Sequence, residues 1–130
     1  MKLESQVISL EMARQLKELG VKQESAFYWH WGNTERWIND FGGSKEGFVP
    51  SASAFTVAEL GELLPFQIEV DDHVYWMVVN QYSSGEWVYN YERTDGEEYP
   101  DGCSEFINHN EATARAKMLI HLIENKVIEP

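Results

Sequence analysis

The residues that could carry metal or acid–base chemistry are four histidines and many acids. His30, His73, His109 and His121 are far apart, and no two stand at the short spacing typical of metal ligands. His30 and His73 lie on expected strands and could meet across a sheet. The sequence has no phosphate-binding loop, dinucleotide fingerprint, HExxH motif, calcium loop or nucleophile elbow. It therefore predicts no catalytic residue, no metal site and no cofactor.

The single cysteine, Cys103, lies in a glycine-flanked turn, and a nucleophilic thiol would need a histidine partner. His109 is near it only in sequence, so an incidental turn cysteine is the simpler interpretation. One cysteine cannot form an internal disulfide, and no apolar signal segment or membrane-spanning run is present. We therefore expect a cytoplasmic protein.

Acids outnumber bases by 22 to 10, which gives a net charge of −12 over 130 residues. Residues 66–110 contain ten acids and a single base, Arg93, so this segment alone carries a net charge of −9. Such a charge argues against direct binding of nucleic acid or of an anionic membrane. It favours a basic or neutral partner. Because acids are so abundant, a pair of carboxylates is no indication of acid–base catalysis.

Aromatic residues are the other unusual feature of the same segment. Trp87, Tyr89 and Tyr91 alternate along one expected strand and share a face, with Val88 on the opposite face. One set must be core, and the other could form an exposed platform for a protein, a sugar or a second copy of the chain. The predicted binding surface combines these three aromatics with three nearby acids: Glu97, Glu98 and Asp101.

The elements that would position these residues follow from periodicity and capping. Three helices are expected, at residues 10–19 after the N-cap Ser9, at 57–64 after a T-x-x-E capping box at Thr56, and at 111–125 after Asn110. The expected strands cover residues 26–31, 66–70, 73–82, 86–92 and, briefly, 105–107. Residues 33–47 are expected to form a loop in which Trp37, Ile38 and Phe41 make a helical turn.

This order predicts an α+β fold in one globular domain, 1–130. Short hairpins join most strands, so the sheet should be mainly antiparallel, with 4–5 strands. The N- and C-terminal helices and the short middle helix should pack on one of its faces.

Three segments resemble small uncharacterised proteins of bacterial phages, prophages and other mobile elements. They are the first helix with the following Ser25-x-Phe27-x-Trp29, the capping-box helix ending in Leu63-Leu64-Pro65, and the alanine-rich start of the last helix from Glu111. These motifs are structural, so the resemblance implies a genomic context and assigns no catalytic residue.

The leading hypothesis is a non-enzymatic accessory protein that binds another protein, with a homodimer as one form of that binding. A second hypothesis is an acidic DNA mimic that inhibits a nucleic-acid-binding protein, which requires a continuous exposed stripe of carboxylates. A third is a small-ligand binder or an enzyme, which requires a pocket with convergent polar groups.

Overall fold

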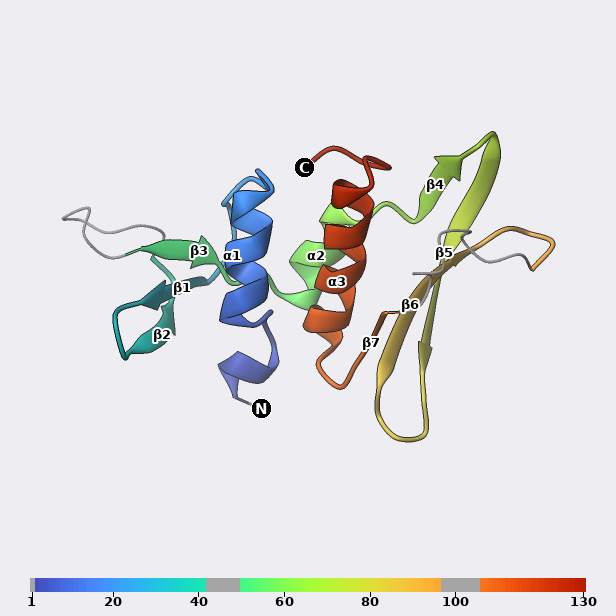
Figure 1. Cartoon of the computed structure of the whole chain (residues 1–130). Coiled ribbons are helices and arrows are strands. Elements are labelled where there is room, and N and C mark those ends of the chain that lie inside the picture. Colours follow the sequence, from blue (N-terminus) through green and yellow to red (C-terminus); the bar gives the residue numbers. More distant parts are fainter. Residues whose placement is uncertain (1, 42–49, 97–105) are drawn as a thin grey trace.

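The fold is described from a computed structural model, which defines residues 2–41, 50–96 and 106–130. Helices lie in the middle of the molecule, with a β-sheet on either side (Figure 1). One sheet has three strands in the order β2-β1-β3, and the other has four in the order β4-β5-β6-β7. All strand pairs in both sheets are antiparallel. The α+β class and the antiparallel pairing are therefore confirmed.

The three expected helices form where the capping residues place them. The helix α1 (Leu10–Glu18) begins after Ser9, whose side chain accepts a hydrogen bond from the Met12 N–H. The helix α2 (Val57–Leu63) begins with a complete capping box. The helix α3 (Glu111–Glu124) begins after Asn110, whose side chain accepts from the Thr113 N–H. A short 3-10 helix, η1 (Leu3–Ser5), precedes them.

The single sheet expected from the sequence is wrong, because the segment 33–47, expected to be a loop with a helical turn, contains a strand. Instead β1 (Tyr28–Trp31) is flanked by β2 (Arg36–Asn39) and by β3 (Ser51–Ser53). Trp37 and Ile38 therefore lie on a strand, paired with His30 and Trp29. Pairing on both edges of β1 creates a second sheet, and the helices cannot all lie on one face of a single sheet.

The four-stranded sheet contains β4 (Gln67–Val70), β5 (His73–Gln81), β6 (Trp87–Glu92) and β7 (Phe106–Asn108). Asp71 and Asp72 join β4 to β5 with positive φ angles of 51° and 65°. Both central residues of a type I′ hairpin turn need that conformation, and Asp tolerates it better than most residues.

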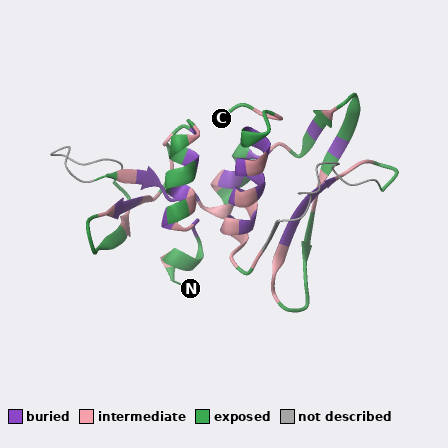
Figure 2. Ribbon diagram, viewed as in Figure 1, coloured by how far each residue is buried: buried purple, intermediate pink, exposed green. Residues whose placement is uncertain are grey.

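Buried side chains form one cluster that extends from the three-stranded sheet through the helices into the four-stranded sheet. Figure 2 shows buried residues in the helices and in strands of both sheets. Helix α3 contacts α1 and α2 as well as β6 and β7. This position explains why it is buried on several sides and begins with small residues such as Ala112 and Ala116.

Candidate functional site

The aromatic part of the predicted binding surface is wrong for two of its three members. Tyr89 and Tyr91 are fully buried, because they lie on the face of β6 that α3 covers. Trp87 is only half-buried and lines a cavity described below. The acidic members, Glu97, Glu98 and Asp101, lie outside the described residues, as does Cys103.

Other aromatics of the same sheet are exposed. Phe66 precedes β4 and is 73% exposed, and Trp76 on β5 is 42% exposed. Their rings stack with centroids 6.4 Å apart and an interplanar angle of 20°. Val74, two residues before Trp76 on the same side of β5, is also exposed. We call Phe66, Val74 and Trp76 the outer patch. Trp76 and Val74 were visible in the sequence as one face of a strand, but the sequence could not show which face the helices leave open.

Acids surround the outer patch. Glu69 is directly opposite Val74 on β4, and Glu92 is opposite Trp76 on β6. A hollow of about 330 Å³ lies beside Trp76, and its lining includes Asp72, His73 and Arg93. Arg93 forms a two-point ion pair with Asp95, at 3.1 and 2.7 Å.

The acids of residues 66–96 lie beside β5, at Glu69 and Glu92, and at both of its ends. Asp71 and Asp72 stand at the turn before it, and Glu86 follows the hairpin after it. Four of the ten acids of the segment 66–110 are outside the described residues, so the continuous stripe that a DNA mimic requires stays a prediction.

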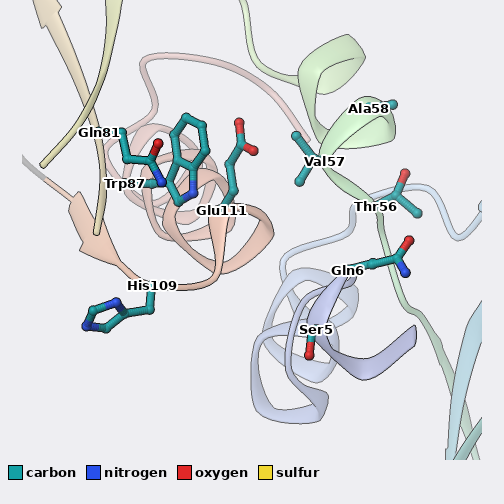
Figure 3. Close-up of a pocket in the computed structure, with 9 residues that line it drawn as sticks. All are labelled: Ser5, Gln6, Thr56, Val57, Ala58, Gln81, Trp87, His109 and Glu111. Atoms are coloured by element: carbon teal, nitrogen blue, oxygen red, sulfur yellow. The ribbon is translucent and has the colours of Figure 1, made fainter. Parts of the chain in front are cut away.

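A second candidate site is a cavity of about 460 Å³ at the opposite end of β5 (Figure 3). It lies where η1, the start of α2, the β5–β6 hairpin and the start of α3 meet. Its lining consists of Ser5, Gln6, Thr56, Val57, Ala58, Gln81, Trp87, His109 and Glu111. Gln81 and Trp87 are directly opposite each other across the hairpin.

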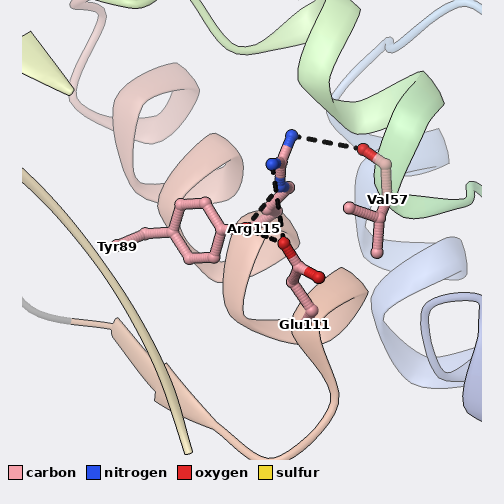
Figure 4. A network of polar contacts seen from close by, with 4 residues as sticks. All are labelled: Val57, Tyr89, Glu111 and Arg115. Atoms are coloured by element: carbon pink, nitrogen blue, oxygen red, sulfur yellow. Dashed lines mark hydrogen bonds and ion pairs between the residues drawn. The ribbon is translucent and has the colours of Figure 1, made fainter. Parts of the chain in front are cut away.

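A network of polar side chains adjoins this cavity (Figure 4). The buried Tyr89 hydroxyl donates to Glu111 Oε1 at 2.6 Å and accepts from Arg115 Nε at 2.6 Å. Arg115 also donates to the carbonyl of Val57 at 3.3 Å and lies 3.6 Å from Glu111 Oε1. Burial and the hydrogen bond to Glu111 raise the pKa of Tyr89 well above its ordinary value. The network ties β6, α2 and α3 together and fixes the Glu111 carboxylate in place.

The sequence analysis did not identify this network. Glu111 and Arg115 were recognisable as an i,i+4 pair on a helix, but nothing in the sequence indicated that Tyr89 and the Val57 carbonyl would join them.

The histidines do not form a shared site in the described residues. His30 is buried in the three-stranded sheet, whereas His73 begins β5 in the other sheet, so the two do not pair. His30 Nε2 lies 2.9 Å from both the Asn39 side-chain oxygen and the Phe41 carbonyl, and its ring stacks on Trp37. No group of three or more metal-binding side chains occurs within residues 2–41, 50–96 and 106–130.

Within the same described ranges, every helix is too short or too polar to cross a membrane. No family model, curated protein or solved structure matches this chain.

Proposed function

We propose that this chain is a non-enzymatic protein-binding module, and that it docks a basic segment of its partner on the outer patch. The observation that carries the proposal is the stacked and exposed pair of Phe66 and Trp76, surrounded by acids. Exposed aromatic clusters of this kind are typical of interfaces, because they bury a large apolar area at little cost in side-chain entropy.

The charge around the patch favours a basic partner over a second copy of the chain. A symmetric dimer through this face would bring Glu69, Asp72 and Glu92 of both copies together, and the repulsion would oppose association. A lysine or arginine would instead pair with these carboxylates while its stem or guanidinium covers Trp76.

The edge of the sheet offers a way to hold such a segment. In the described sheet β4 is an edge strand. The Met77 N–H donates to the Phe66 carbonyl at 2.8 Å. In an antiparallel pair every second residue hydrogen-bonds to the neighbouring strand, so the main-chain groups of Ile68 and Val70 also point towards β5. The N–H and C=O groups of Gln67 and Glu69 therefore face away from β5. An extended partner segment could hydrogen-bond to them as a fifth strand.

Self-pairing at the same edge would place Glu69 side chains close together. Charged side chains on edge strands are a common protection against such pairing. The arrangement thus favours a basic strand over an identical one.

The test uses a synthetic extended peptide of alternating Lys and Val residues, and a matched peptide with Glu in place of Lys. We expect the basic peptide to bind, with an affinity that falls as salt is added, and the acidic peptide not to bind. Isothermal titration calorimetry measures both. Trp76→Ala, and separately Glu69→Gln with Asp72→Asn, should each weaken binding about tenfold, equivalent to about 1.4 kcal/mol.

Matched controls separate a local site from general attraction to an acidic protein. Trp37→Ala removes another exposed tryptophan, and Glu18→Gln with Glu62→Gln removes two exposed acids elsewhere. These variants should bind the basic peptide as the parent does. Equal weakening by the controls, or no binding of the basic peptide by the parent, would refute the proposal.

The proposed module would serve as an accessory protein of a phage or other mobile element, because its helical motifs resemble those of small proteins from such elements. A cytoplasmic location, a single domain 1–130 and the DNA-mimic alternative remain predictions.

A further inference from the structure

The cavity at the start of α3 is lined by the carboxylate of Glu111, one oxygen of which is available to a ligand. Glu111 Oε1 interacts with both Tyr89 and Arg115, whereas Oε2 has no hydrogen-bond partner among the described residues. Because the network holds Oε1, the orientation of Oε2 is fixed before any ligand arrives. A fixed acceptor of this kind binds a hydroxyl or amide donor without first having to be ordered.

An aromatic ring and amide side chains complete the cavity. Trp87 lies beside Glu111 among the lining residues, and Gln81 stands opposite Trp87 on the neighbouring strand (Figure 3). Ser5 contributes a hydroxyl group from the other side, where the hydroxyl of Thr56 is held in the capping box of α2. The volume of about 460 Å³ is within the range of small-molecule sites, about 300–1,000 Å³.

The charges at the cavity disfavour ligands of either sign. The Glu111 carboxylate and the net charge of −12 oppose an anion. The Arg115 guanidinium offsets that carboxylate, and the N-terminus of α3, with its partial positive charge, lies at the cavity, which opposes a cation. A neutral ligand with both donors and acceptors fits the remaining chemistry.

We propose that this cavity binds a neutral, hydroxyl-rich ring, of which a pyranose sugar is the chemical type. Its C–H face lies on the indole of Trp87, and one of its hydroxyls donates to Glu111 Oε2. The amide of Gln81 exchanges hydrogen bonds with a neighbouring hydroxyl, because an amide side chain supplies both a donor and an acceptor. This site is separate from the outer patch and does not depend on the protein-binding proposal.

The experiment is a titration of the ¹⁵N-labelled chain with D-glucose, D-galactose and N-acetyl-D-glucosamine, followed by nuclear magnetic resonance. We expect at least one sugar to shift the indole N–H of Trp87 and the amides around Glu111 saturably. The dissociation constant should be about 1–10 mM, as for a ligand of this size with few contacts. Tetramethylammonium chloride and inorganic phosphate are the charged probes and should leave these signals unmoved.

Variants locate the binding. Trp87→Ala should abolish the shifts around Glu111. Gln81→Ala removes an exposed side chain, whose amide donates one long hydrogen bond to the Gly85 carbonyl at 3.4 Å, and should weaken binding about tenfold. Gln67→Ala is the matched control, because it removes an exposed glutamine of β4 outside the cavity, and it should have no effect.

Three results would overturn the proposal. The first is the absence of any saturable shift with all three sugars. The second is a shift of equal size at the exposed indoles of Trp37 and Trp76 that persists in Gln81→Ala, since this would indicate unspecific stacking. The third is a change in the chemical shifts of the cavity residues on addition of a charged probe but not on addition of the sugars.

Discussion

The Tyr89 hydroxyl joins three elements, and its removal gives a quantitative test of the network. Tyr89→Phe keeps the buried ring but deletes the bond donated to Glu111 and the bond accepted from Arg115, both 2.6 Å long. Hydrogen bonds to charged groups contribute about 1.5–3 kcal/mol each. Because Glu111 and Arg115 already lie 3.6 Å apart, they can recover part of this loss by approaching each other. We expect the free energy of unfolding to fall by about 2–3 kcal/mol.

Urea denaturation followed by circular dichroism measures this change. For a protein of this size the midpoint should fall by about 1–2 M. The control is Tyr82→Phe, which removes the hydroxyl of a 45% exposed tyrosine and should leave the midpoint unchanged. A loss for Tyr89→Phe no larger than that of the control would show that the network contributes nothing to stability. The reasoning that it fixes the Glu111 carboxylate would then fail as well.

Three further predictions concern the core and the helix caps. Burial raises the pKa of Tyr91, and burial together with the hydrogen bond to Glu111 raises that of Tyr89, above the ordinary 10.0. The tyrosines of the unfolded chain therefore ionise at lower pH than those of the folded chain, so the free energy of unfolding should be constant below pH 10 and should fall as the pH rises further. Urea titrations and ultraviolet phenol titration at several alkaline pH values check this. Ionisation of all tyrosines without unfolding would contradict it. Thr56→Ala removes the N-cap of α2 and should cost about 1 kcal/mol in thermal unfolding, whereas an unchanged melting temperature would show that the cap is dispensable. Leu122→Ala leaves a cavity at a fully buried position of α3 and should cost about 2–5 kcal/mol, while Leu63→Ala, at a 38% exposed position, should cost less than about 1 kcal/mol. Equal costs in urea denaturation would mean that burial does not rank these sites.

Local signals in the sequence predicted the helices well, because the cap and the helix lie within a few residues of each other. Ser9, Thr56 and Asn110 each accept the expected main-chain hydrogen bond. The second sheet was not predicted, because its strands β2 and β3 have four and three residues and the pairing partner, β1, is distant in sequence from β3. Glycines between the two strands also favoured a loop.

Which face of β6 packs against α3 could not be read from the alternation of its residues, and the opposite face is buried as well, at Val88 and Asn90. Trp87, Tyr89 and Tyr91 were correctly placed on one face, but only the position of α3 decides that this face belongs to the core. In the structure, the hydrogen bonds of the tyrosine hydroxyls show how these polar groups are accommodated in the core. The hydroxyls of Tyr89 and Tyr91 find partners in Glu111 and Pro65, at 2.6 and 2.5 Å, which come from distant parts of the chain.

The central position of α3 also has a consequence for how the chain folds during synthesis. This helix follows every strand in the sequence, yet it packs against β6 and β7 and against the two other helices. The side chain of Asn110, just before it, donates to the carbonyls of Ser5 and Val7, 105 and 103 residues earlier. The inner face of the four-stranded sheet and the two carbonyls that accept from Asn110 lack these partners until α3 has been synthesised. Contacts between residues so far apart in sequence form slowly, so we expect the contacts of α3 with the rest of the fold to form late in folding.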